Sequence, residues 1–84
     1  MLFFAMAVSN PEADNVTDRC FENGEWKTVK PTYHITASWH DKVGIIHTKI
    51  LHNIPWWDTI HLKVGTQIVV KQAHDGYKFV RAVT

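Results

Sequence analysis

The sequence predicts an all-β fold, a small antiparallel β-barrel of about five to six strands. Short β-prone runs separated by turn residues fill most of the chain, and no segment has the periodicity of a long amphipathic helix. The 84 residues allow a single domain, residues 1–84. Their hydrophobic content of 45% supplies one small core and argues against intrinsic disorder.

The apolar run at residues 2–8 predicts the first strand. A signal peptide is the alternative, but no basic residue precedes the run, so we favour the strand. Residues 9–15 contain Asn10-Pro11 and predict a loop. No segment is long enough to span a membrane.

A hairpin is predicted around the pair Asn23-Gly24, between the β-prone segments 19–21 and 26–29. Pro31 then interrupts any ladder that continues, because proline has no N–H to donate.

Residues 33–39 predict a longer strand, since apolar and polar residues alternate there. One face would carry Tyr33, Ile35, Ala37 and Trp39, and the other would carry His34, Thr36, Ser38 and His40. Residues 40–42 predict a turn into the β-prone run 43–52, in which Gly44 indicates a bulge or a bend. Pro55 at a first helical position then predicts one short helical turn.

The stretch from Leu62 to Thr84 predicts a β-hairpin whose register decides which residues are exposed. With a loop at Asp75-Gly76, both faces would mix apolar and charged residues. With a loop at His74-Asp75-Gly76 and a bulge at the glycine, the two faces separate, and we favour this register. One face then carries Ile68, Val70, Val80 and Ala82, and the other carries Val69, Lys71, Ala73, Tyr77, Phe79 and Arg81.

The runs 50–54 and 62–68, followed by Asp75-Gly76 and Ala82-Val83, resemble the C-terminal half of cold-shock and related OB-fold domains. The resemblance implies an OB-like barrel, with an SH3-like barrel of similar size as the alternative. The aromatic RNA-binding motifs of the cold-shock family have no clear match, so the resemblance assigns no binding residue.

Charge is distributed unevenly along the chain, although the formal net charge is only +1. Residues 1–25 carry five acidic residues and one arginine, a net charge of −4, whereas residues 26–84 carry eight basic and three acidic residues, a net charge of +5. A basic body with an acidic leading segment predicts a surface that binds polyanions. The alternative is an ordinary solvated surface.

We expect a non-catalytic protein that binds single-stranded nucleic acid, RNA in preference to DNA. Such proteins combine cations for the phosphates with aromatic rings on which the bases stack. In the favoured register, cations and aromatic rings share one face of the C-terminal hairpin. The predicted nucleic-acid-binding residues are Lys49, Lys63, Lys71, Tyr77, Phe79 and Arg81. The alternative for the aromatic residues is a place in the core.

Protein binding is the alternative function. A small β domain of this kind fits an accessory or inhibitor protein of the phage or mobile-element type, with or without the help of RNA. Tryptophans are enriched among binding hot spots, so Trp56 and Trp57 are the predicted partner-binding residues. An unpaired edge strand would offer a route to dimers.

The sequence predicts no enzyme, no metal site and no cofactor. Its six histidines lack the H-x-x-x-H spacing, and His47 and His52 would fall on opposite faces of a regular strand. Histidines with a lysine, or Cys20 with a histidine, are residue types that can catalyse reactions, but no motif brings them together. A lone cysteine forms no internal disulfide, which favours a reducing, cytoplasmic location.

Overall fold

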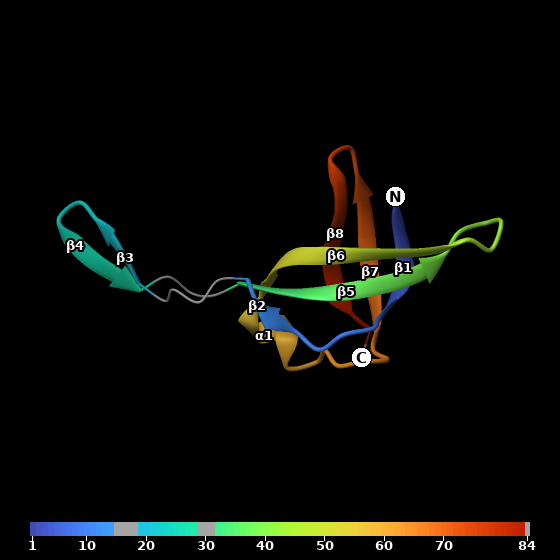
Figure 1. The fold of residues 1–84 in the computed structure, drawn as a ribbon, viewed down its shortest axis with the longest axis horizontal. Helices are drawn as coiled ribbons and strands as arrows, with labels where there is room; N and C mark the ends of the chain where they lie inside the picture. The colour runs from blue at the N-terminus through green and yellow to red at the C-terminus, as the bar shows by residue number, and fades with distance from the viewer. Residues whose placement is uncertain (15–18, 29–31, 84) are drawn as a thin grey trace.

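The computed structural model describes residues 1–14, 19–28 and 32–83 (Figure 1). The described elements are strands apart from one short helix, so the all-β prediction is confirmed. In chain order they are β1 (Leu2–Ala7), β2 (Glu12–Ala13), β3 (Arg19–Glu22), β4 (Glu25–Thr28), β5 (Thr32–His40), β6 (Ile46–Pro55), α1 (Trp56–Thr59), β7 (Gln67–Ala73) and β8 (Gly76–Ala82). In the part of the chain that the structure describes, no helix is long and apolar enough to cross a membrane.

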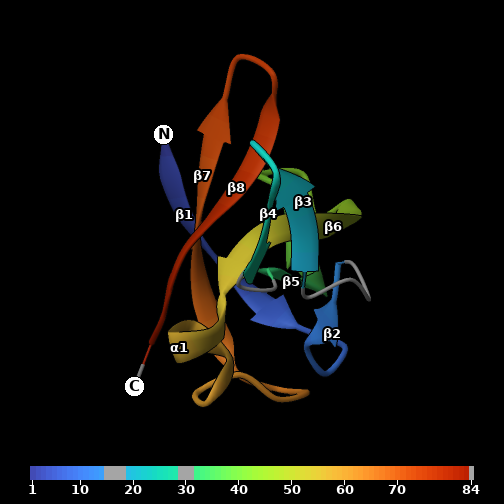
Figure 2. The same ribbon diagram turned by 90° about the vertical axis from the view of Figure 1, so that its left-hand side faces the viewer.

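The main sheet contains six antiparallel strands, and β3 and β4 form a separate hairpin. The main sheet runs in the order β6-β5-β1-β7-β8. The short β2 pairs with β5 on the edge that β1 also uses, so β1 and β2 act as one interrupted strand. The two end strands, β6 and β8, contact each other and cross steeply (Figures 1 and 2). Among the described residues they are not hydrogen-bonded as a pair, so the sheet is curved but does not close into the expected barrel.

Each end strand contains a bulge. In β6, His52 and Asn53 together lie opposite one residue of β5, and Asn53 adopts the left-handed conformation with φ of 62°. In β8, Val80 is the extra residue, because Val69 pairs with Arg81 and Val70 pairs with Phe79. Bulges bend a strand and protect its edge from pairing, which accounts for the open seam between β6 and β8.

The core lies on the concave side of the curved sheet. The alternation predicted for β5 is confirmed, because Ile35 and Ala37 are fully buried while Tyr33 and Trp39 pack against the core. Fully buried or nearly buried residues come from four strands of the main sheet, β1, β5, β6 and β7. They are Ala5, Ala7, Ile35, Ala37, Leu51, Ile54, Ile68 and Val70, joined by Leu62. Burial of each large aliphatic side chain stabilises the fold by roughly 1.5–3 kcal/mol.

The C-terminal hairpin is confirmed, and the favoured register is correct at its base, where Ile68 pairs with Ala82 and Val69 with Arg81, but it is wrong from Val80 to the tip. The loop is His74-Asp75, and Gly76 already belongs to β8, where it pairs with Ala73. Gly76 has φ of 136°, a conformation that side chains rarely allow. The bulge lies at Val80, near the middle of β8, and it reverses the alternation of faces between the two halves of the strand.

Three further local predictions can be compared with the structure. The hairpin at Asn23-Gly24 is confirmed, and both residues have positive φ, as a type I′ turn requires. The helical turn after Pro55 is confirmed as α1. Gly44 lies in the turn between β5 and β6, not at a bulge within a strand.

The predicted loop at 9–15 contains the two-residue strand β2, so that prediction needs correction. A two-residue strand leaves no alternating pattern in the sequence; it forms because β5 offers it an edge. Three predicted positions lie outside the described residues. They are residue 15, the end of the predicted loop, residue 29, the end of the predicted hairpin, and residue 31, the proline predicted to interrupt a ladder.

Candidate functional site

Two hollows lie along the open seam between β6 and β8. One, of about 340 Å³, has Phe3, Trp39, Lys42, His47 and Tyr77 in its lining. The other, of about 370 Å³, is lined by Ile50, His52, Asn53, Tyr77, Lys78 and Phe79. Because Tyr77 lines both, the two hollows form one continuous surface, which we call the β6–β8 groove.

The strand pairing also places a lysine on the concave side of β6. Directly opposite residues of antiparallel strands share a face. Lys49 lies opposite Ala37, which is fully buried on the concave side, and His47 lies opposite Trp39. The exposed Lys49 side chain therefore belongs to the side of β6 that carries His47 and faces the seam.

An aromatic cluster forms one wall of the groove. The ring of Trp39 lies 4.9 Å from that of Phe3 and 5.0 Å from that of Tyr77, measured between centroids. His47 stacks on Trp39 at 5.8 Å with an interplanar angle of 19°. Phe3, Trp39, Tyr77 and Phe79 are half-buried, so they support the core and still present ring surface to the groove.

The structure brings together only some of the predicted nucleic-acid-binding residues. Tyr77 and Phe79 lie on the concave side, because they pair with Gln72 and with the buried Val70. Both line the β6–β8 groove, and Lys49 lies on the same concave side, next to the hollows but in the lining of neither.

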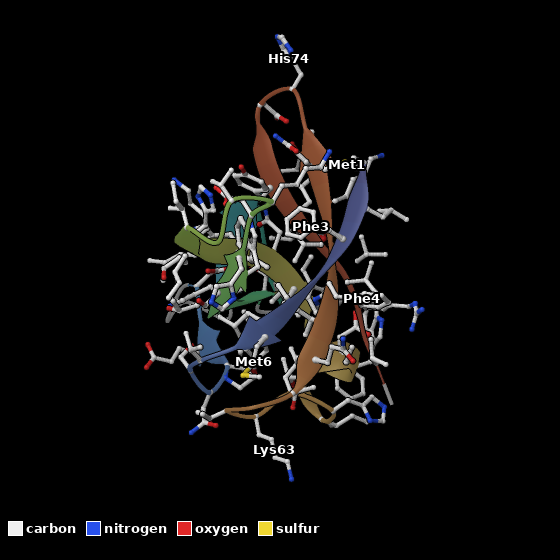
Figure 3. All side chains as sticks on the ribbon, turned by 90° about the vertical axis from the view of Figure 1, so that its right-hand side faces the viewer. Met1, Phe3, Phe4, Met6, Lys63 and His74 are labelled. Carbon is white, nitrogen blue, oxygen red and sulfur yellow. The ribbon has the colours of Figure 1, made fainter. Side chains whose placement is uncertain are left out.

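The other three predicted cations lie elsewhere. Lys71 and Arg81 are on the outer side of the hairpin, so they do not share a face with Tyr77 and Phe79. Lys63 is in the segment between α1 and β7, at the end of the molecule opposite the hairpin tip at His74 (Figure 3). The expected surface of Lys71, Tyr77, Phe79 and Arg81 is therefore not a single face.

The outer side of β1, β7 and β8 is a second surface, with apolar and basic residues. Leu2 pairs with Lys71, and Phe4 pairs with Val69, which pairs in turn with Arg81. Phe4 is 61% exposed and points away from the side that holds Phe3 (Figure 3). This outer face has one exposed aromatic ring, whereas the groove has several rings in contact with one another.

The predicted partner-binding tryptophans occupy the short helix α1. Trp56 and Trp57 are 49% and 54% exposed, and their rings meet edge to face with centroids 6.1 Å apart. Ile60 and Val64, which follow the helix, are also exposed. The result is an apolar surface distinct from the groove.

A cluster of one aspartate and two histidines lies where β2 meets β5 and β6. Asp14 Oδ1 is 2.9 Å from Nδ1 of His34 and 2.9 Å from Nδ1 of His52. Asp14 Oδ2 accepts hydrogen bonds from the Thr32 hydroxyl at 2.8 Å and the Asn53 backbone N–H at 3.2 Å. The carboxylate therefore has four partners from two strands.

These partners determine the protonation of the cluster. Desolvation raises the pKa of Asp14, but the hydrogen bonds from His52, Thr32, Asn53 and His34 outweigh it and hold the pKa well below its usual range. An ionised carboxylate only accepts hydrogen bonds. Both histidines must therefore carry a proton on Nδ1 in this arrangement.

A second aspartate–histidine pair closes the turn between β5 and β6. Asp41 Oδ2 is 3.0 Å from His47 Nε2, and Asp41 Oδ1 accepts hydrogen bonds from the N–H groups of Val43 and Ile45. The His47 hydrogen bond, followed by that of Ile45, lowers the pKa of Asp41. This pair holds His47 in place beside Trp39.

No sequence pattern indicates the cluster of Asp14, His34 and His52, because its members come from two strands and from the residue that follows β2. The sequence placed His34 on the polar face of its strand correctly, but it contained no sign that Asp14 would pair alongside. The bulge at His52 and Asn53 also turns His52 toward His34, with ring centroids 5.4 Å apart. No regular spacing predicts such a bulge.

No protein-family model matches this chain, and comparisons with curated proteins and with solved structures also find no match.

Proposed function

We propose that this protein binds single-stranded nucleic acid, RNA by preference, in the β6–β8 groove and without catalysing a reaction. The observation that carries the proposal is the combination of half-buried aromatic rings with basic side chains along one hollowed surface. Bases stack on aromatic rings regardless of sequence, and each stacked base contributes about 1–3 kcal/mol. Tyr77 and Phe79 would supply stacking surfaces.

Cations along the groove would contact the phosphates. Lys49 is on the concave side of β6, Lys42 lines the first hollow and Lys78 lines the second. Lys42 and Lys78 at the two hollows, with Lys49 on the concave side of β6, suit a strand whose backbone follows the groove. A duplex would not fit this role, because its bases are stacked on one another and are not free to stack on protein rings.

The strand order supports an OB-like arrangement, which we propose in preference to an SH3-like one. Five strands follow the order β6-β5-β1-β7-β8, and α1 lies between the third and fourth of them along the chain. Pairing of β6 with β8 would close this sheet into a barrel. OB folds are partly open five-stranded barrels, and many bind oligonucleotides on the second and third strands and the loop between the fourth and fifth. Here those elements are β5, β6 and the turn at His74-Asp75, which border the groove.

The experiment is a titration of labelled single-stranded RNA with two matched charge reversals, Lys49→Glu on the concave side of β6 and Lys71→Glu on the outer face. Both lysines are exposed on strands. We expect Lys49→Glu to weaken RNA binding by about tenfold or more at low salt, and Lys71→Glu to change it by less than about threefold. Equal losses of RNA affinity in the two variants would mean that binding depends on the net charge of the protein or on the outer face, which would contradict the proposal.

Stacking has its own matched pair, Phe79→Leu in the groove and Trp57→Leu on α1. The groove variant should weaken RNA binding about fivefold or more, because it removes a stacking ring. The Trp57 variant should bind like the wild type, because this exposed ring lines neither hollow. Single-stranded DNA and duplex RNA, titrated at two salt concentrations, complete the test. No binding of a single strand at low salt would contradict the proposal.

Exposed tryptophans support a second candidate function, that of a small accessory or inhibitory protein that binds a protein partner through α1. Trp56, Trp57 and Ile60 together present an apolar surface of the kind found at interface hot spots. Trp57→Ala should abolish retention of the partner in a pull-down and leave RNA binding unchanged. Recovery of the same partner in the same amount with this variant would exclude the role of Trp57.

A further inference from the structure

Three strands bring Asp14, His34 and His52 together beside the groove. We propose that these residues bind a divalent transition-metal ion of the Zn²⁺ type through Asp14 Oδ1 and the Nδ1 atoms of both histidines. The proposal does not depend on nucleic-acid binding, and it concerns an ion that would fasten β2 to the β5–β6 hairpin.

The geometry of the ligand atoms suits such an ion. One ligand atom from each residue lies within 4.8 Å of the other two. Each histidine Nδ1 is 2.9 Å from Asp14 Oδ1. Zn²⁺ binds nitrogen and oxygen at about 2.0–2.2 Å, which separates two tetrahedral ligands by roughly 3.3 Å. Each Nδ1–Oδ1 distance therefore needs to grow by only about half an ångström to admit the ion.

The surrounding residues already orient Asp14. Its Oδ2 is engaged by the Thr32 hydroxyl and the Asn53 N–H, which leaves Oδ1 directed at the two imidazoles. Asn53 can donate this hydrogen bond because it adopts a left-handed conformation in the β6 bulge. Hydrogen bonds that fix a ligating carboxylate in this way are typical of metal sites.

A second carboxylate faces the far side of His34. Glu12 Oε2 is 3.6 Å from His34 Nε2, on the ring nitrogen that would not bind the ion. When the ion binds Nδ1 of a neutral His34, the Nδ1 proton is lost to solvent and Nε2 takes one up, so that Nε2–H can donate to Glu12. A cationic His34 already carries the Nε2 proton and releases only its Nδ1 proton to solvent. Metal-ligating histidines usually have such a partner.

The ligand types select the kind of ion. Two imidazole nitrogens and one carboxylate oxygen favour Zn²⁺, Co²⁺, Ni²⁺ or Cu²⁺ over Mg²⁺ and Ca²⁺, which prefer all-oxygen sites. Asp14 is 16% exposed and His52 is 60% exposed at the side chain, so the ion can enter from solvent. Three protein ligands leave a fourth position open to water.

Isothermal titration of the full chain without a polyhistidine tag, with ZnCl₂ and in the absence of nucleic acid, tests the proposal. We expect saturable binding of one ion per chain in the wild type. His52→Ala should weaken binding more than tenfold, and because His52 is exposed, this variant should fold. Glu12→Gln should weaken it about tenfold. His74→Ala, at the exposed tip of the β7–β8 hairpin, is the matched control and should bind like the wild type (Figure 3).

Two further measurements make the result decisive. Far-ultraviolet circular dichroism confirms that each variant is folded, and NMR should show Zn²⁺ shifting the ring signals of His34 and His52 but not those of His74. MgCl₂ should give no saturable binding. Equal Zn²⁺ affinities for the wild type and His52→Ala, or no saturable binding at millimolar Zn²⁺, would overturn the proposal and identify the cluster as an ion-free hydrogen-bond network.

Discussion

Asp14 and Asp41 use the same chemistry over very different distances along the chain. Each carboxylate lies 2.9 or 3.0 Å from a histidine nitrogen and also accepts backbone hydrogen bonds. Asp41 binds His47, which is six residues away in the same turn. Asp14 binds His34 and His52, which are 20 and 38 residues away on two other strands.

The Asp41 hydrogen bonds are therefore local interactions, whereas the Asp14 hydrogen bonds are tertiary interactions. The Asp41 hydrogen bonds can form in an isolated hairpin, so part of their energy is already present in partly folded chains. The Asp14 hydrogen bonds form only after β2, β5 and β6 have assembled. Loss of Asp14 should therefore affect the stability of the whole sheet, whereas loss of Asp41 should mainly loosen one turn.

Asp14→Ala should have the largest effect on stability. It removes the acceptor of the Thr32 hydroxyl, the Asn53 N–H and both histidines, and hydrogen bonds to a charged group are individually strong. We expect the free energy of unfolding to fall by about 2–3 kcal/mol. Urea denaturation at neutral pH with EDTA, which removes any contribution from bound metal, measures it. The matched variant Asp41→Ala should lose clearly less, and equal losses would contradict the distinction.

Thr32→Val should have an intermediate effect, because it deletes a single donor to Asp14 and preserves the shape of the side chain. The expected loss is about 1 kcal/mol in the free energy of unfolding, measured in the same denaturation experiment. Thr36→Val, four residues further along the same face of β5, is the control and should stay within about 0.5 kcal/mol of the wild type. A control as damaging as Thr32→Val would show that β5 merely tolerates valine poorly.

The sequence predicts features that depend on neighbouring residues better than features that depend on residues far apart in the chain. Alternation in Tyr33–Trp39, the Asn23-Gly24 turn and the helical turn after Pro55 are local signals, and the structure confirms them. The favoured register of the last hairpin is correct at the base and wrong toward the tip, because one bulge at Val80 reverses the faces and valine gives no signal for a bulge. Tyr77 and Phe79 consequently moved to the concave side.

The candidate sites depend on longer-range pairing and were predicted only in part. Lys49, Tyr77 and Phe79 lie on the same concave side because β6 and β8 contact each other, although the two strands are far apart in sequence. His52 reaches Asp14 through a bulge on one strand and the short strand β2. A single sequence has no periodic pattern for such pairing, because each strand alone satisfies the alternation rule in more than one arrangement.

The smallest effect concerns pH and the Asp41 turn. Hydrogen bonds from His47 and the Ile45 N–H lower the pKa of Asp41 in the folded protein. A group with a lowered folded pKa adds stability that is fully present above its unfolded pKa and is lost as the pH falls through the folded value. Asp41→Asn should therefore be less stable than the wild type at pH 6. The difference should shrink below about pH 4, where the unfolded carboxyl takes up its proton.

Thermal unfolding of both proteins between pH 2 and 7 tests this behaviour, with Asp58→Asn on the exposed helix α1 as the control for loss of one charge. Asp41→Asn removes the carboxylate but keeps the size of the side chain and one acceptor oxygen. Its curve should meet that of the wild type only at acid pH, because a protonated aspartate resembles asparagine there. A constant separation at all pH values would mean that the turn depends on the shape of Asp41 and not on its charge.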